Sequence, residues 1–183
     1  MSDDIRARMI ELLPRLRRFS YALTGNLDEA DDLVQETCAR ALMSAAQWQV
    51  GTRLDSWMYR IAQNLWFDKL RATKSRGEVV DVETAIGLAG SDGRDVTESR
   101  LTLQVVTKSI AQLPADQQLV IAYVCVDGLS YKDAANALGI PIGTVMSRLA
   151  RARIALHAAL TSGGGTLAPA PLGNGVSNAR RLR

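Results

Sequence analysis

The sequence predicts an all-α protein made of two small helical domains joined by a flexible linker. Apolar residues recur at helical spacing through most of the 183 residues, and no convincing run alternates apolar and polar residues as a half-buried strand would. Residues 77–96 interrupt this pattern with glycines and charged residues, which is typical of a linker. We therefore expect a first domain at 1–76 and a second at 97–160. Residues 161–183 are rich in Gly, Pro and Ser and are expected to form a disordered tail.

The first domain is expected to contain three helices. The first should break or restart at Pro14, which has no backbone N–H to donate, and should stop at Gly25. Asn26 followed by Glu29 has the spacing of a capping box and predicts a second helix over residues 27–48. That helix is expected to bury Ala30, Leu33, Val34, Thr37, Ala41 and Leu42. Thr52 with Asp55 then predicts the cap of a third helix, whose core residues would be Leu54, Trp57, Ile61, Leu65 and Leu70.

In the second domain, helices are expected from about residue 95, with a break at Pro114, and residues 130–149 have the form of a helix-turn-helix. Ser130 and Asp133 make a capping box, and Gly139 permits the left-handed turn between the two helices. Ala134 and Ala135 are small where the helices cross, and Val145 and Leu149 should be buried. The residues left facing outward, toward a major groove, are Ile142, Gly143, Met146, Ser147 and Ala150, flanked by Arg148, Arg151 and Arg153.

The distribution of charge is more informative than the net charge, which is only 22 − 19 = +3. Residues 141–183 hold six arginines and no acid, and residues 53–76 hold six basic residues against two acids. Between them, residues 77–100 hold six acids and two arginines. Two basic blocks separated by an acidic stretch suggest two modules that face nucleic acid.

Composition also excludes several classes of protein. No apolar run approaches the roughly 18–20 residues of a membrane span, and the N-terminus has no apolar signal region, so we expect a cytoplasmic protein without membrane insertion. Cys38 and Cys125 lie 87 positions apart without CxxC spacing, so neither a zinc knuckle nor a disulfide framework is expected, and both should be buried thiols. His157 is the single histidine, which removes most histidine-based catalytic and metal sites. We expect no cofactor, no metal and no enzymatic activity.

Three motifs resemble those of one protein family. DEADDLVQETCARAL, residues 28–42, resembles the core-binding helix of bacterial sigma factors, and LDSWMYRIAQNLWFDKLR, residues 54–71, resembles their promoter-melting helix. GLSYKDAA at 128–135 with GIPIGTVMSRLARAR at 139–153 resembles their C-terminal promoter-recognition motif. The order of the motifs and the short linker are similar to the extracytoplasmic-function (ECF, group IV) class. Within that class, ALTGN and GTVMSRLARAR resemble the EcfG-like general-stress group.

The resemblance implies a sigma factor that binds core RNA polymerase and directs promoter-specific transcription initiation by recognising −35 and −10 elements. Its implied partners are the β′ clamp helices and β flap of the polymerase, promoter DNA and an anti-sigma factor. The implied polymerase-binding residues are Asp28, Asp31, Asp32, Leu33, Gln35 and Glu36. The implied −10 contacts, around a pocket for a flipped base in the loop 48–53, are Trp48, Gln49, Arg53, Arg60, Asn64, Lys69 and Arg71. The implied −35 contacts are Thr144, Met146, Ser147, Arg148, Ala150, Arg151 and Arg153.

Two of the implied −35 positions depart from the family pattern. Met146 stands where many members have Lys or Arg, and Ala150 where a larger residue is common, so DNA shape would contribute more to −35 recognition. The alternative to a DNA contact for Asn64 is a hydrogen bond between helices.

Three other functions would require different features. A sigma-like mimic that sequesters an anti-sigma factor should lose the recognition-helix arginines and gain a receiver domain. A simple helix-turn-helix repressor would not need the DDLVQE helix, and a DDxxD-type magnesium enzyme would need a second acidic cluster.

Overall fold

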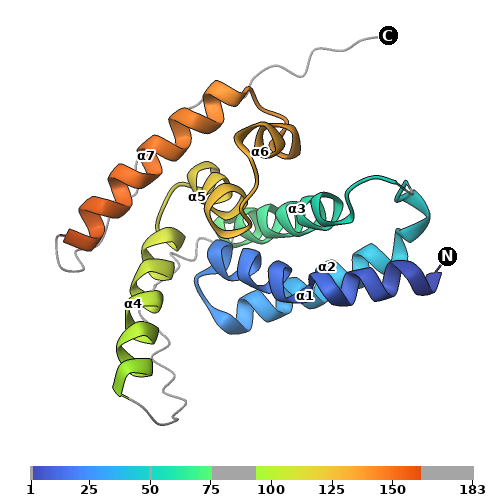
Figure 1. The fold of residues 1–183 in the computed structure, drawn as a ribbon, viewed down its shortest axis with the longest axis horizontal. Helices are drawn as coiled ribbons and strands as arrows, with labels where there is room; N and C mark the ends of the chain where they lie inside the picture. Colours follow the sequence, from blue (N-terminus) through green and yellow to red (C-terminus); the bar gives the residue numbers. More distant parts are fainter. Residues whose placement is uncertain (1, 50, 76–93, 162–183) are drawn as a thin grey trace.

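The computed structural model describes residues 2–49, 51–75 and 94–161, and within these ranges every regular element is a helix (Figure 1). The predicted all-α class is confirmed. The N-terminal half consists of α1 (Ser2–Thr24), α2 (Leu27–Met43), a short 3₁₀ helix η1 (Ala45–Gln47) and α3 (Leu54–Ser75). The C-terminal half consists of α4 (Arg94–Ala111), α5 (Ala115–Ile121), a π-helical turn η2 (Ala122–Val126), α6 (Tyr131–Leu138) and α7 (Ile142–Thr161).

Most of the predicted linker, 77–96, and of the predicted tail, 161–183, lies outside the described residues. The last three residues of the linker range belong to α4, and the first residue of the tail range ends α7. The domain boundaries therefore stay predictions. None of the helices in the described ranges combines the length and the apolar character needed to cross a bilayer.

The predicted start of α2 is confirmed by its cap. The side chain of Asn26 accepts hydrogen bonds from the backbone N–H groups of Asp28, at 2.8 Å, and Glu29, at 3.2 Å, which satisfies two of the free donors at the helix start. Gly25 ends α1 with a φ of 70°, in the left-handed region. A Cβ placed on Gly25 would lie 2.5 Å from the Cβ of Ala111 in α4, so glycine also permits a close approach between the two halves.

Pro14 lies inside α1, so the predicted break at this residue was wrong. Proline removes only the hydrogen bond to the carbonyl of residue 10, four positions earlier. Ile10 is 66% exposed and Pro14 is exposed as well, so water can replace the missing donor. On the other side of α1, Leu16 and Phe19 are buried in the core, and this packing keeps the helix continuous.

Two other predicted boundaries of helices differ from the structure. The second helix ends at Met43, and the 3₁₀ turn η1 (Ala45–Gln47) occupies most of the remaining stretch up to Trp48. Thr52 does not cap α3, because that helix begins at Leu54 and the Thr52 hydroxyl donates instead to the carbonyl of Gln49, at 2.7 Å. Side-chain bonds of this kind compete with helix capping, which the spacing of polar residues alone does not reveal.

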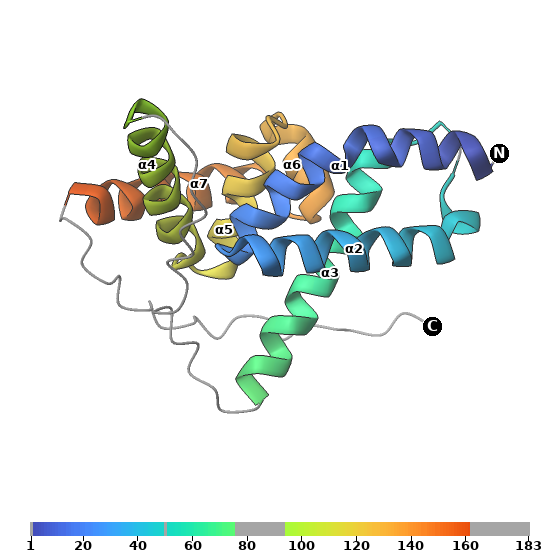
Figure 2. The same cartoon turned by 90° about the horizontal axis from the view of Figure 1, so that it is seen from below.

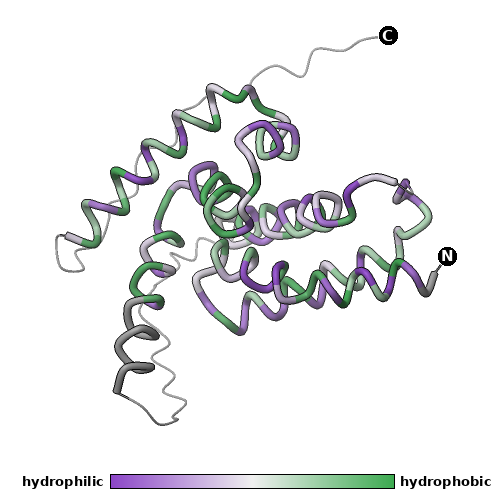
Figure 3. The backbone as a smooth tube through the Cα atoms, in the orientation of Figure 1, coloured by the Kyte–Doolittle hydropathy of each residue, from purple (hydrophilic) through white to green (hydrophobic). Residues whose placement is uncertain are grey.

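Some residues that were expected in the core are exposed. Leu42 is 45% exposed, because it lies about 100° around α2 from the buried Ala41. Leu70 is 40% exposed, and Figure 2 shows the last turns of α3 extending beyond the other helices. Cys125, also predicted to be buried, is exposed on η2, whereas Cys38 is half-buried. Figure 3 shows the alternation of hydrophobic and hydrophilic residues along the helices that this packing requires.

The two halves pack against each other through aromatic rings. Phe19 of α1 stacks on Tyr59 of α3 with ring centroids 4.6 Å apart, and Tyr123 of η2 meets both rings edge-on at 5.0 and 6.0 Å. All three side chains are at most 1% exposed. α1 also contacts α4 and α5, so the first helix provides much of the contact between the two halves (Figures 1 and 2).

Asp127, directly after η2, adds a polar contact at this interface. Its Oδ1 accepts hydrogen bonds from the Tyr59 hydroxyl, at 2.5 Å, and from Nε of Arg15, at 3.1 Å. The Tyr123 hydroxyl donates to Oε1 of Gln63 in α3, at 3.2 Å. Burial, together with the bond to Asp127, raises the pKa of Tyr59, and burial raises the pKa of Tyr123, so both phenols stay protonated and able to donate.

Candidate functional site

The acidic helix α2 presents an exposed polar face that begins at its capped end. Asp28, Asp32 and Gln35 are exposed and lie along the middle of that face. At its two edges the acids are paired within the N-terminal half. Asp31 accepts two hydrogen bonds from Arg17 of α1, at 2.6 and 2.8 Å, and Glu36 lies 3.7 Å from Nζ of Lys69 in α3. These pairs fix the edges of the face and leave its centre open to a partner.

Leu33 does not belong to this surface, contrary to the sequence-based prediction. It is fully buried and packs in the core with Phe19 and Leu23 of α1. At about 100° per residue, Leu33 lies roughly 140° around α2 from Asp28, on the side that packs against the other helices. A contact from Leu33 to polymerase would require the bundle to open, so Leu33 stabilises the fold that presents the acidic face.

α3 carries a polar face that runs along most of its length. Arg60, Asn64 and Arg71 are exposed and recur at spacings of four and seven, which places them on one side of the helix. Arg71 pairs with Asp68 at 2.6 Å. Lys69, predicted as another −10 contact, lies on the opposite side of α3 from Arg60 and pairs with Glu36 of α2. Lys69 therefore belongs to the seam between α2 and α3.

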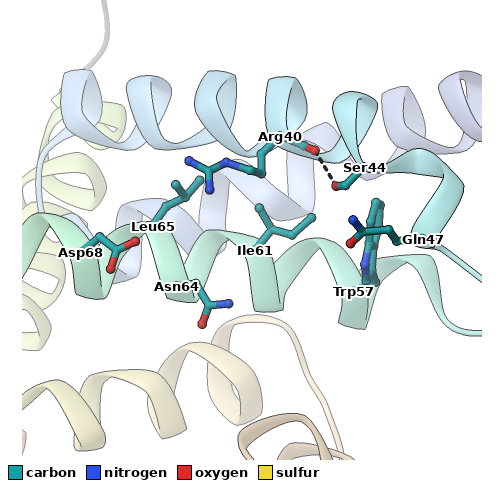
Figure 4. A pocket seen from close by; sticks show the side chains of 8 residues that line it. All are labelled: Arg40, Ser44, Gln47, Trp57, Ile61, Asn64, Leu65 and Asp68. Carbon is teal, nitrogen blue, oxygen red and sulfur yellow. Dashed lines mark hydrogen bonds between the residues drawn. The ribbon is translucent and has the colours of Figure 1, made fainter.

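A hollow of about 290 Å³ lies where the end of α2, η1 and α3 meet. Its lining residues are Arg40, Ser44, Gln47, Trp57, Ile61, Asn64, Leu65 and Asp68. Figure 4 shows Trp57 and Gln47 together at one end and Asp68 at the other, while Arg40 reaches from α2 toward α3 and Asn64 points away from α2. A half-buried indole beside guanidinium, amide and carboxylate groups can stack on a nucleobase and bind its edge.

The sequence did not predict the contribution of Arg40, Ser44 and Gln47 to this hollow, because the resemblance placed the base pocket in the loop 48–53. A signal was available, since Arg40 follows Glu36 by four residues and ends the polar face of α2. Asn64 makes no hydrogen bond between helices within the described ranges, so the structural role weighed for it finds no support. Trp57, predicted as core, is half-buried at the rim.

The loop before α3 contains one buried and two exposed candidate residues. Trp48 is only 9% exposed, and the guanidinium of Arg8 lies 5.1 Å from the centroid of its ring. Trp48 therefore packs in the core and does not offer a surface on which a base could stack. Gln49 and Arg53 are exposed. Burial would raise the pKa of Asp55, but hydrogen bonds from Arg53 and from a backbone N–H hold it below its usual range.

The helix-turn-helix has the predicted geometry. The Ser130 hydroxyl caps α6 by accepting from the backbone N–H of Asp133, at 3.1 Å, and Gly139 adopts a φ of 65° between the helices. Ala134 is fully buried and belongs to the same core as Val145 and Leu149 of α7. The outward residues are exposed as predicted: Ile142, Gly143, Met146, Ser147 and Ala150. Of the other candidates, Arg151 and Arg153 are exposed and Thr144 is half-buried.

Arg148 occupies a different position from the other arginines of α7. Its Nε lies 2.9 Å from Oδ2 of Asp116 in α5, and its side chain is only 27% exposed. It lies about 160° around the helix from Ala150, on the side that packs against α5. Arg148 is therefore tied to α5 and is less exposed than Arg151, which lies about 60° away around the helix. In the described ranges, no group of three or more His, Cys, Asp or Glu side chains could hold a metal ion.

Comparison with known proteins gives two family matches in the same order as these surfaces. A family model for sigma-70 region 2 matches residues 9–76, and a model for sigma-70 region 4 matches residues 103–156. The chain is 36% identical over 160 residues to the ECF RNA polymerase sigma factor EcfG of Rhodopseudomonas palustris, a match that covers 87% of each chain. It is 31% identical over 152 residues to the ECF sigma factor SigW of Bacillus subtilis, covering 78% of this chain and 81% of SigW.

Solved structures with a similar fold include two that hold a partner chain. RpoE of Bartonella quintana, in complex with the anti-sigma factor NepR, superposes with a TM-score of 0.70 at 32% identity, covering 87% of this chain and 98% of RpoE. CnrH, in complex with the cytosolic domain of CnrY, superposes with a TM-score of 0.67 at 21% identity, covering 89% and 91% of the two chains. At that identity, the second likeness concerns the fold alone.

Proposed function

This chain belongs to the ECF class of sigma-70 family RNA polymerase sigma factors, and we propose that its exposed surfaces each bind a different partner in promoter-specific transcription initiation. The observation that carries the proposal is a pair of surfaces on one chain. The N-terminal half presents an exposed acidic face on α2, and the C-terminal half presents an exposed, acid-free face on α7. The first suits a basic protein surface and the second suits a nucleic acid.

The acidic face of α2 is proposed to dock on the clamp helices of the polymerase β′ subunit. Asp28, Asp32 and Gln35 would supply the contacts, because they are exposed at the centre of the face. Asp31 and Glu36 would contribute at its edges, where their partners Arg17 and Lys69 already neutralise part of their charge. The C-terminal half is proposed to contact the β flap.

The polar face of α3 is proposed to follow the −10 element. Arg60 and Arg71 would contact phosphates, and Gln49 and Arg53 would extend that path along the preceding loop. The hollow beside Trp57 would hold a base extruded from the duplex, with Asn64 at its rim. Unstacking a base costs a few kcal/mol, which stacking and edge hydrogen bonds in such a pocket can offset.

α7 is proposed to enter the major groove of the −35 element. The N-terminal residues of a recognition helix contact base edges, which corresponds here to the exposed residues from Ile142 to Arg151. Arg153 would contact a phosphate. Arg148 would act indirectly, by fixing the angle between α7 and α5 through Asp116.

We further propose that the chain itself has no active site, since the polymerase performs the chemistry, and that it acts in the cytoplasm with that enzyme. Because RpoE, at 32% identity, was solved with the anti-sigma factor NepR, we propose that an anti-sigma factor binds this chain as well. The alternative is a mimic that sequesters the anti-sigma factor without binding DNA. Such a mimic would not need solvent-facing arginines such as Arg151 and Arg153 on α7.

Run-off transcription with core polymerase on a genomic promoter library tests the proposal. We expect transcripts that depend on the chain and start downstream of a shared pair of −35 and −10 sequences. A variant with Asp32→Lys and Glu36→Lys should lose these transcripts in parallel with its binding to core polymerase, and polymerase without the chain is the blank. If no core enzyme gives a transcript that depends on the chain, while the chain still captures an anti-sigma factor, the mimic is the correct function.

A further inference from the structure

The exposed face of α7 carries an unusual apolar stripe. Ile142, Met146, Ala150 and Ile154 follow one another at intervals of four, so they lie along one side of the helix. Ile142 is 49% exposed, Met146 53% and Ile154 70%, and Ala150 is exposed as well. The core of the C-terminal half uses the adjacent side of α7, through Val145 and Leu149 and the residues that follow them at helical spacing. The stripe lies beside this buried side and is left largely open to solvent in the described part of the chain.

Charge around the stripe indicates what kind of partner would cover it. Arg151 and Arg153 are exposed on either side of its second half, and no acid occurs from residue 141 to the C-terminus. An apolar protein surface would gain nothing from these flanking cations. A polyanion that presents apolar groups between its charges fits both features, and duplex DNA is such a partner. In its major groove the thymine C5-methyl is the apolar group on a base edge.

The stripe is also poor in groups that could bind bases in another way. Ile142, Met146 and Ala150 have no side-chain hydrogen-bond donor, so they cannot bind the N7 and O6 acceptors of guanine. Ser147, next to the stripe, donates its hydroxyl proton to the carbonyl of Thr144, at 3.1 Å. Base pairs opposite this part of the helix can therefore be distinguished by methyl contact but not by donation from the stripe.

We propose that Ile142 and Met146 recognise thymine methyl groups, so that at least one A·T pair of the −35 element is specified by apolar contact. These two residues lie in the first two turns of α7, the part of a recognition helix that reaches base edges. The inference rests on the proposed −35 recognition by α7 and adds the base that this helix selects. Burying one methyl group contributes about a fourfold change in affinity, which sets the size of the effect.

Replacement of thymine by deoxyuridine tests the inference, because it removes only the C5-methyl and keeps all hydrogen-bonding groups. Holoenzyme assembled from the full chain and core polymerase would be titrated against promoter duplexes in which each −35 thymine, on either strand, is replaced in turn. We expect binding to weaken about fourfold at one or two positions. In holoenzyme carrying Met146→Ala or Ile142→Ala, deoxyuridine at one of these positions should no longer weaken binding.

The matched control is Ile10→Ala, which truncates an apolar side chain of similar exposure on α1, in the other half of the chain. Its response to deoxyuridine should equal that of the wild type. Selective promoter binding without any position sensitive to deoxyuridine would overturn the inference and leave the proposed function standing. An unchanged response in both Met146→Ala and Ile142→Ala would overturn the assignment to these residues. If the wild-type holoenzyme shows no promoter selectivity at all, the proposed function is refuted, and the inference with it.

Discussion

Replacing Asp127 by alanine should weaken the contact between the two halves and lower the free energy of unfolding. The carboxylate lies at the interface with its side chain only 1% exposed, and the substitution leaves the buried Tyr59 hydroxyl without its acceptor. A hydrogen bond to a charged group contributes about 1.5–3 kcal/mol. Arg15 is 37% exposed, so solvent screening limits its ion pair to roughly 0–1 kcal/mol. The expected loss is therefore about 1.5–4 kcal/mol.

Urea unfolding followed by tryptophan fluorescence measures this loss by linear extrapolation. Small-angle scattering gives a second readout, because the radius of gyration should rise if the halves separate. Arg17→Ala is the matched control, since it removes an ion pair to Asp31 in which both side chains are largely exposed, at 55% and 42%. That variant should unfold like the wild type.

The reasoning would be refuted by a specific result. If Asp127→Ala unfolds within about 0.5 kcal/mol of the wild type, the usual range for surface substitutions, the contact does not hold the halves together. A large loss in Arg17→Ala as well would show that ion pairs stabilise this chain regardless of burial. In either case, the aromatic packing of Phe19, Tyr59 and Tyr123 would have to account for the interface.

Four further predictions concern titration, docking and recognition. The pKa of Tyr59 is raised in the folded chain, so the protonated phenol contributes its full stabilisation below about pH 10 and loses it as the pH rises further. Between about pH 10 and 12, the free energy of unfolding should therefore fall less in Tyr59→Phe than in the wild type, which urea titrations measure. Asp32→Lys with Glu36→Lys should weaken binding to core polymerase by about 1–3 kcal/mol in a pull-down titration, with an unchanged circular dichroism spectrum; equal binding would contradict the docking surface. If Arg151 contacts a base, Arg151→Ala should weaken −35 binding by about 1–3 kcal/mol and relax the sequence preference at one position. If Arg151 contacts only phosphate, the variant should lower the salt slope of binding by about one for all sequences. Arg148→Ala should change neither the base preference nor the salt slope, which equilibrium binding at several salt concentrations measures.

The sequence by itself determined the features that depend on neighbouring residues. The caps at Asn26 and Ser130 need only a side-chain oxygen and a backbone N–H two or three residues later, and both form as predicted. Gly139 adopts a left-handed φ in the turn between α6 and α7, which glycine permits because it has no Cβ. The outward face of α7 followed from helical spacing as well, because Val145, Leu149 and Ala152 recur at spacings of four and three and define the buried side. Three motifs in order were enough to indicate the family.

The tertiary structure decided which side of each helix a partner can reach. Leu33 and Trp48 match motif positions that should contact a partner, yet both are buried, because residues distant in the chain cover them. Arg148 follows the pattern of its neighbours in α7 but is held by Asp116 of α5. Asp127 gave no signal in the sequence, since its partners lie 68 and 112 residues away. Helical spacing fixes the angle between neighbours on one helix, whereas burial depends on which other helix packs there, and that is set only when the whole chain folds.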